Sequence, residues 1–183
     1  EKEFAVAIPL AEKALGPEDP KVIEMLWVES ELFFAEGKYE EAEEVGLKAL
    51  ALAEKVLGPE DIVVAFCLDE LGRVYSQTGR YEEAKQAFNR SLAIKAGKDP
   101  MESMTYVTLM DLGSVYYRQG DYAKAEEYYR KSLEIEPHYY KAWHNMGTVY
   151  YYYAKQARDA GDREAARDFI DKSIDYYYGS LGI

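Results

Sequence analysis

The sequence predicts an all-α protein in which about four helical hairpins stack into an α-solenoid. Four short glycine turns recur along the chain, 41 or 42 residues apart, and each lies between two segments with the apolar periodicity of a helix. The turns are EGKYEEAE (36–43), TGRYEEAK (78–85), QGDYAKAE (119–126) and AGDREAAR (160–167). A single hairpin cannot bury both of its faces, so such units must stack to complete a common core.

Small residues recur at fixed places in both helices of each hairpin. The first helices read LDELGRVY from Leu68, LMDLGSVY from Leu109 and WHNMGTVY from Trp143. After the turns, an alanine is followed four residues later by a bulky residue: Ala84 by Phe88, Ala125 by Tyr129 and Ala166 by Ile170. Antiparallel helices approach closely only where side chains are small, and large residues fill the gaps beside them. The first unit departs from this pattern, with LWVESELF from Leu26 and the pair Ala42 and Gly46.

This pattern resembles that of the tetratricopeptide repeat family, which is W-x2-L-G-x2-Y, then A-x3-F, then P. The matching residues are Trp143, Gly147 and Tyr150 in one unit, and Leu112, Gly113, Tyr116, Ala125, Tyr129 and Pro137 in another. The resemblance extends from residue 1 to about residue 178. It implies a right-handed superhelix of hairpins whose concave face binds a segment of a partner protein.

The spacing predicts a single array over residues 1–183. We expect residues 1–16 to form the second helix of a truncated repeat, followed by repeats at 20–57, 61–97, 99–136 and 138–178. The stretch LGPED, at 15–19 and 57–61, reads as a helix stop at Gly-Pro followed by an aspartate that starts the next helix. Asp99, with Pro100 and Glu102, is expected to start a helix in the same way. The first helix of the last repeat is seven residues longer than its counterpart, which extends it by two turns.

The long units in residues 1–66 look like the repeats of kinesin light chains. That resemblance implies an adaptor whose first helices present asparagines to a cargo peptide. The matching pairs here are Trp27 and Val28, Asp69 and Glu70, Met110 and Asp111, and His144 and Asn145. Only Asn145 keeps the asparagine, so kinesin-type cargo recognition is not expected. A clamp for a terminal carboxylate is not expected either, because Glu70 and Asp111 would repel it.

The composition excludes several classes of protein. A net charge of −12 repels phosphate groups, so we expect no nucleic acid partner, and no apolar run approaches the ~18 residues of a spanning helix, so we expect no membrane insertion. The one cysteine, Cys67, lies in the apolar run VVAFCL and is expected to be a buried structural residue. The start EKEFAVAIPLAEKAL lacks the features of a signal peptide, which slightly favours a cytoplasmic location. A chain whose signal peptide had been removed would look the same.

The sequence offers no basis for catalysis, a cofactor or a metal. His138 and His144 are six residues apart, and no Ser, Cys or set of carboxylates at metal-binding spacing accompanies them. The glycines follow the repeat turns and form no phosphate-binding loop. We therefore expect a non-enzymatic protein.

Tyrosine is concentrated in the second half of the chain. Of 18 tyrosines, 15 follow residue 100, including YYYY at 150–153 and YYY at 176–178. Four successive residues cover the whole circumference of a helix, so they cannot all be core. Tyr150 falls on a core position, whereas Tyr151 and Tyr152 fall where the family's first helices face the groove. Tyrosines suit binding surfaces, but the family's ordinary use of tyrosine in its repeats is an equally good explanation of the excess.

These residues predict a concave, acidic and tyrosine-rich groove that binds a basic or apolar protein segment. A solvated helix face would carry the same acidic residues. The predicted partner-binding residues are Asp69, Glu70, Arg73, Met110, Asp111, Tyr117, Arg118, His144, Asn145, Tyr151 and Tyr152. In the alternative prediction, the chain is a structural module or a piece of a longer array. Its uncapped ends would then mediate self-association or docking, through Tyr176, Tyr177 and Tyr178.

Overall fold

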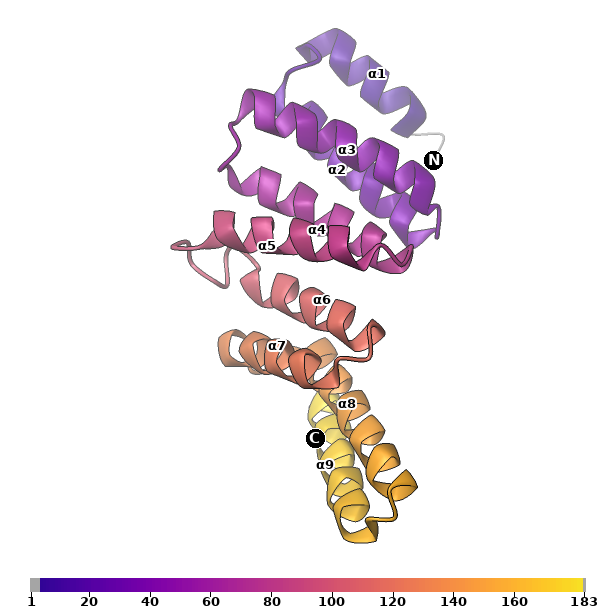
Figure 1. Cartoon of the computed structure of the whole chain (residues 1–183). Coiled ribbons are helices and arrows are strands. Elements are labelled where there is room, and N and C mark those ends of the chain that lie inside the picture. The colour runs from indigo at the N-terminus through magenta and orange to yellow at the C-terminus, as the bar shows by residue number, and fades with distance from the viewer. Residues whose placement is uncertain (1–3, 183) are drawn as a thin grey trace. The chain divides into compact units, whose positions relative to one another are not determined.

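The computed structural model describes residues 4–182, so residues 1–3 and 183 of the predicted array lie outside it. Within that range the chain forms nine helices and no strand, which confirms the predicted all-α class (Figure 1). The helices fall into two compact units, Glu1–Gly97 (unit 1) and Lys98–Ile183 (unit 2). In the described part of the chain, no helix combines the length and apolar character needed to cross a bilayer.

Unit 1 contains five helices that pack against one another in sequence. They are α1 (Phe4–Leu15), α2 (Pro20–Ala35), α3 (Tyr39–Val56), α4 (Ile62–Gln77) and α5 (Tyr81–Lys95). Helices α2 and α3 form one hairpin and α4 and α5 the next, while α3 also packs on α4 and α1 packs on α2 (Figure 1).

Two of these helices start where the repeated stretch LGPED ends. Asp19 caps α2 and Asp61 caps α4, and each carboxylate accepts a hydrogen bond of 2.9 Å from the backbone N–H two residues further on. The preceding Gly16 and Gly58 have φ of 102° and 95°, a conformation in which only glycine is unstrained. LGPED therefore stops one helix and starts the next, as predicted.

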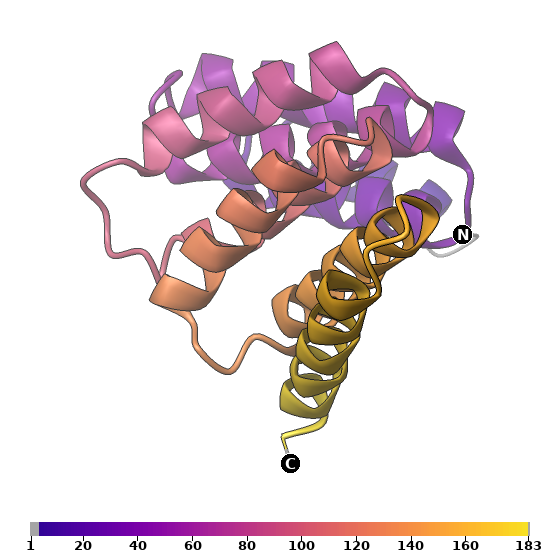
Figure 2. The same ribbon diagram turned by 60° about the horizontal axis from the view of Figure 1, so that its bottom comes forward.

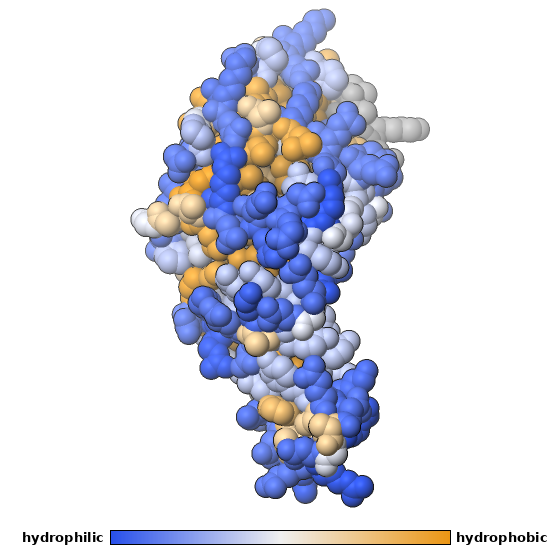
Figure 3. Space-filling model, viewed as in Figure 1, coloured by the Kyte–Doolittle hydropathy of each residue, from blue (hydrophilic) through white to orange (hydrophobic). Residues whose placement is uncertain are grey.

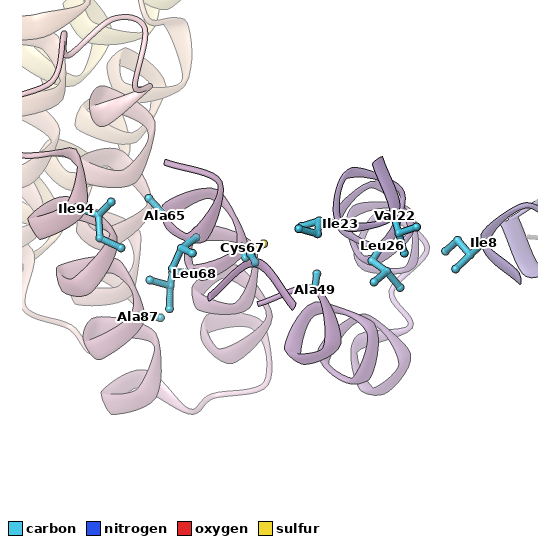
Figure 4. Packing of buried hydrophobic residues seen from close by; sticks show 12 residues of the cluster. Ile8, Val22, Ile23, Leu26, Ala49, Ala65, Cys67, Leu68, Ala87 and Ile94 are labelled. Atoms are coloured by element: carbon cyan, nitrogen blue, oxygen red, sulfur yellow. The ribbon is translucent and has the colours of Figure 1, made fainter. Parts of the chain in front are cut away.

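The main hydrophobic cluster of unit 1 is built from aliphatic side chains and one cysteine (Figure 4). The buried residues labelled there are Ile8, Val22, Ile23, Leu26, Ala49, Ala65, Cys67, Leu68, Ala87 and Ile94. Cys67 is buried, and burial raises the pKa of its thiol to about 12. The burial of Cys67 confirms the prediction of a buried, structural cysteine.

The two hairpins of unit 1 close around small residues in different ways. In α4–α5, Gly72 lies under the ring of Phe88, and a Cβ atom on the glycine would stand 2.7 Å from a ring carbon. In α2–α3 the residues at the same two places are Ser30 and Gly46, both small. The space is filled by Leu71 of α4, whose Cδ2 lies 3.0 Å from a Cβ built on Gly46. In the first repeat, which departs from the repeat pattern, a side chain of the next repeat therefore fills the space that an aromatic ring fills in α4–α5.

Unit 2 contains α6 (Thr105–Arg118), α7 (Tyr122–Ile135), α8 (Tyr140–Asp159) and α9 (Arg163–Leu181). The predicted helix start at Asp99 is wrong. Its carboxylate accepts hydrogen bonds from the backbone N–H groups of Met101 and Glu102, but these residues form a turn. Met104 then adopts a left-handed conformation with φ of 54°, which interrupts any helix, and α6 begins at Thr105.

The last hairpin is longer than the one before it. In α6–α7, Gly113 lies under Tyr129, 16 residues further along the chain. In α8–α9, Gly147 lies under Tyr177, which is 30 residues further along. Both α8 and α9 therefore carry seven extra residues, or two turns, beyond this contact. Figure 2 shows the two long helices running side by side.

The matched extension changes which residues hold the last hairpin together. The predicted pairing of Ala166 with Ile170 at the repeat position is wrong, because both lie two turns beyond it, towards the tip of the hairpin. Ser173 takes the place of the alanine instead. It is buried, and its hydroxyl donates a hydrogen bond of 2.8 Å to the carbonyl of Gly147.

The core of unit 2 is rich in tyrosine. Tyr129 is 1% exposed and Tyr150 is 9% exposed, which confirms the core position predicted for Tyr150. Each hydroxyl has a partner: Tyr129 donates to Ser114 Oγ at 3.2 Å, and Tyr150 donates to Glu126 Oε1 at 2.9 Å. Buried tyrosines are stable only when their hydroxyls are paired, so this core depends on polar side chains of neighbouring helices.

Candidate partner-binding surfaces

The predicted site residues of unit 1 lie on α4 and are engaged in ion pairs. Asp69 is half-buried and accepts a hydrogen bond of 2.6 Å from the ammonium of Lys95 on α5. The Lys95 side chain is only 1% exposed, and its ammonium also lies 5.2 Å from the centre of the Phe66 ring. The negative charge of Asp69 is thus balanced within the unit.

Glu70 is buried, and its carboxylate is only partly satisfied. One oxygen accepts a hydrogen bond of 2.8 Å from Arg73, whose guanidinium lies 4.6 Å from the centre of the Phe34 ring, while Oε1 has no partner. Burial raises the pKa of Glu70 to about 7. Arg73 lowers this pKa, whereas Glu31 and Asp69 raise it further. Glu70 is therefore much less acidic than a surface glutamate.

In unit 2 the structure brings four of the predicted residues together between two first helices. Asn145 of α8 donates from Nδ2 to Met110 Sδ of α6 at 3.3 Å and to Ser114 Oγ at 3.4 Å. Seven residues further along each helix, Tyr117 and Tyr152 meet edge to face, with ring centres 5.6 Å apart. We call this contact, made by Met110, Tyr117, Asn145 and Tyr152, the α6–α8 seam.

Tyr122 of α7 completes the exposed end of the seam. Its ring stacks on Tyr152, with centres 5.0 Å apart, and lies 5.5 Å from Tyr117, so each of the three rings contacts the other two. All three side chains remain partly exposed. Burial, together with a hydrogen bond to Tyr152, raises the pKa of Tyr117. The cluster presents aromatic surface whose rings are held by contact with one another.

The remaining predicted residues of unit 2 lie outside the seam. Asp111 is half-buried and Arg118 exposed on α6, and their charges act in opposite directions on the pKa of Tyr129, which burial raises to about 12. His144 and Tyr151, seven residues apart, are exposed on a different side of α8 from Asn145 and Tyr152. The structure thus divides the residues predicted for α8 between two surfaces.

The three tyrosines predicted for self-association differ in accessibility. Tyr176 stacks on Tyr150, with ring centres 5.2 Å apart, and Tyr177 packs over Gly147 and hydrogen-bonds to Thr148. Both are half-buried within the α8–α9 hairpin. Tyr178 is 55% exposed, so it is the tyrosine of the three that remains available for self-association.

Sequence reasoning missed Lys95 and Tyr122 as parts of these surfaces. Lys95 follows Phe88 by seven residues, which places it on the buried face of α5, and a lysine there requires an acidic partner. Tyr122 occupies the first position of its helix and reaches Tyr152 only because α8 packs on α7. The described residues contain no group of three or more His, Cys, Asp or Glu side chains that could hold a metal ion.

Comparison with solved structures identifies the same architecture in other proteins. The crystal structure of BtubC (BKLC) from P. vanneervenii matches with a TM-score of 0.72 and 20% identity, over 99% of this chain and 76% of that one. A putative kinesin light chain from Podosopora anserina, described as having nearly identical TPR-like repeats, matches with a TM-score of 0.68 and 18% sequence identity. The match covers 96% of this chain and 84% of that one. MamA matches with a TM-score of 0.64 and 22% sequence identity, over 100% of this chain and 93% of that one. At these identities the likeness shows the fold alone.

Family models identify the repeats directly. Two models, both described as tetratricopeptide repeat, match residues 30–96 and 106–139, which together make up more than half of the chain. No curated protein matches the sequence. Repeats of this kind generally serve as scaffolds for protein–protein interaction. The chain belongs to the tetratricopeptide repeat family and folds as an all-helical repeat solenoid, as its sequence predicts.

Proposed function

We propose that this chain is a non-enzymatic adaptor that binds a segment of a partner protein, and that the α6–α8 seam is its principal contact surface. The observation that carries the proposal is the cluster of Tyr117, Tyr122 and Tyr152, which are partly exposed yet fixed by contact with one another. Aromatic side chains that are already ordered lose little conformational entropy on binding, so they contribute more affinity than mobile ones.

The chemistry of the seam suggests the kind of segment that it binds. Tyrosine rings favour apolar or aromatic anchors, and their hydroxyls with the Asn145 amide offer hydrogen bonds to a backbone. The predicted preference for a basic partner has less support, because Asp69 is paired with Lys95, and Glu70 with Arg73. We therefore propose a segment with apolar anchors.

Selection of peptides from a random display library on the immobilised chain tests this proposal with no partner chosen in advance. The recovered peptides should be rich in aromatic and aliphatic residues, and Tyr152→Ala should weaken their binding at least tenfold. Tyr140→Ala is the matched control, since Tyr140 lies on the same helix, is 57% exposed and lies outside the seam. Equal binding to both variants and to the unaltered chain would place the contact elsewhere. Far-UV circular dichroism checks that both variants remain folded.

A further inference from the structure

The outer face of the α8–α9 hairpin carries a row of exposed apolar side chains. Ile170, Ile174, Tyr178 and Leu181 follow one another at intervals of four, four and three residues, so they lie on one side of α9. Their exposed fractions run from 41% to 69%. Figure 3 shows, on the face that it views, small apolar patches on this hairpin separated by hydrophilic residues. We call this row the α9 stripe.

A pocket of about 250 Å³ continues the α9 stripe at the tip of the hairpin. Its apolar wall is made by Tyr151, Ala154, Ala166 and Ile170, and its basic side chains are Lys155, Arg158 and Arg167. Arg158 hydrogen-bonds to Asp159. Lys155 and Arg167 form no ion pair with any carboxylate in the described part of the chain. A basic rim of this kind stands out in a chain with a net charge of −12.

The α6–α7 hairpin carries a corresponding pair of residues, and there a neighbouring helix packs on the pair. The contacts of Gly113 with Tyr129 and of Gly147 with Tyr177 align the two hairpins. In this alignment Tyr151 corresponds to Tyr117 and Ile170 to Tyr122. Tyr152, an aromatic side chain from the helix that packs on α7, contacts the rings of both Tyr117 and Tyr122. The pocket at the tip therefore lies beside the residues that correspond to Tyr117 and Tyr122, the pair on which an aromatic ring of a neighbouring helix packs.

The same alignment indicates what else a helix packed on α9 would contact. Glu126 of α7 accepts the hydroxyls of Tyr150 and Tyr153 from α8, and its counterpart on α9 is Ile174, which can accept no hydrogen bond. A helix packed on α9 should therefore carry apolar residues at the positions where α8 has Tyr150 and Tyr153. The end of α8 that bears Tyr152 lies at the start of α7, so a helix placed in this way runs antiparallel to α9.

We propose that the outer face of the α8–α9 hairpin binds an amphipathic helix of another protein, antiparallel to α9. An aromatic residue of this helix enters the pocket between Tyr151 and Ile170, and acidic residues beside it face Lys155 and Arg167. This surface is separate from the α6–α8 seam, so the inference goes beyond the function proposed above. Charge complementarity selects an acidic helix rather than a basic one.

A peptide based on α8 itself is a suitable probe, because Tyr152 of α8 packs on the corresponding residues of the α6–α7 hairpin. The probe comprises residues 140–159 with Tyr150→Phe and Tyr153→Phe, which suit Ile174, and with Lys155→Glu and Arg158→Glu, which suit the basic rim. Fluorescence anisotropy of the labelled peptide with the full chain should show saturable binding that weakens as salt concentration rises. The same peptide with Tyr152→Ala should bind at least tenfold more weakly.

Variants of the chain identify the surface. Ile174→Asp should abolish binding of the probe, whereas Leu47→Asp, at a residue of similar exposure on α3, should leave binding unchanged. Replacing Lys155 and Arg167 together by Glu should reverse the preference, so that the peptide with its original Lys155 and Arg158 binds better than the acidic one.

Three results would overturn the proposal. One is the absence of saturable binding at millimolar peptide, and another is binding that Ile174→Asp does not alter. The third is a dimer of the unaltered chain in light scattering that Ile174→Asp converts to a monomer, because a second copy would then be the occupant of this face.

Discussion

The two units are built from the same kind of hairpin but fill their cores with different chemistry. In unit 1 the main hydrophobic cluster is aliphatic, Phe88 is buried over Gly72, and the buried polar groups include Lys95, which pairs with Asp69, and the partly satisfied Glu70. In unit 2, Tyr129 takes the place that Phe88 has in unit 1, and the hydroxyls of Tyr129 and Tyr150 bond to Ser114 and Glu126. The repeat thus specifies the size of each residue, while its polarity can differ wherever a neighbouring helix supplies a partner.

The largest effect on stability is expected from removing the aromatic ring that packs over the glycine of each hairpin's first helix. Phe88→Ala in unit 1 and Tyr129→Ala in unit 2 should each lower the free energy of unfolding by about 3 to 5 kcal/mol, because each leaves a cavity against a helix that cannot close it. Urea unfolding followed by circular dichroism measures both. If Tyr129→Ala cost less than about 1 kcal/mol, tyrosine would not play the core role of phenylalanine in unit 2.

The ion pair of unit 1 should respond unequally to the loss of its two members. Asp69→Ala leaves the almost fully buried Lys95 without its carboxylate and should cost about 3 kcal/mol. Lys95→Met should cost less, because it replaces the ammonium with an apolar group and because Asp69 can take up water. Urea unfolding of the two variants at pH 7 compares them, and equal losses would show that the burial of Lys95 is not what makes the pair costly to break.

Glu70 should make the stability of unit 1 depend on pH. Its pKa is about 7 in the folded chain and 4.5 in a free glutamate, so the folded state binds the additional proton between these values. This contribution to stability is present below pH 4.5 and is lost as pH rises through 7, by about 3 kcal/mol in total. Glu70→Gln should remove this dependence. The difference in unfolding free energy between the two proteins at pH 5 and pH 8 measures it, and a constant difference would contradict the assignment.

The smallest expected effect concerns a single hydroxyl in unit 2. Tyr150→Phe removes the hydrogen bond to Glu126 and should cost about 1 kcal/mol, since Glu126 keeps its bonds to Tyr153 and Arg130. Tyr140→Phe is the control, because the side chain of Tyr140 is mostly exposed. Equal stability of the two variants in urea would mean that the tyrosine core of unit 2 gains nothing from its hydroxyl partners.

The features that sequence reasoning predicted are those set by local chemistry. Asp19 and Asp61 cap their helices because glycine and proline end the preceding ones, and Cys67 and Tyr150 are buried because their spacing places them on core faces. The features that it missed depend on register between helices. One miss is local instead: Asp99 has the right neighbours for a helix start, but the left-handed Met104 delays the helix to Thr105.

The same limit applies to the candidate site. Met110, Asn145, Tyr117 and Tyr152 were predicted from their positions on the first helices, but their mutual contacts could not be, because these depend on how α6 and α8 pack. The pairing of Asp69 with Lys95 joins residues 26 positions apart, and no local pattern links them. Whether the predicted residues bind a partner remains a prediction that the seam variants test.

The matched extension of α8 and α9 makes the length of this hairpin adjustable. Seven residues turn a helix through almost two full revolutions, so adding seven to each helix leaves the contact of Gly147 with Tyr177 in register and moves only the connecting turn. Insertions or deletions in paired sets of seven can therefore lengthen or shorten the tip while the residues that hold the repeat together stay in place. A repeat of this family can thus gain a new surface at its tip through two compensating insertions, without any change to the contacts that fold it.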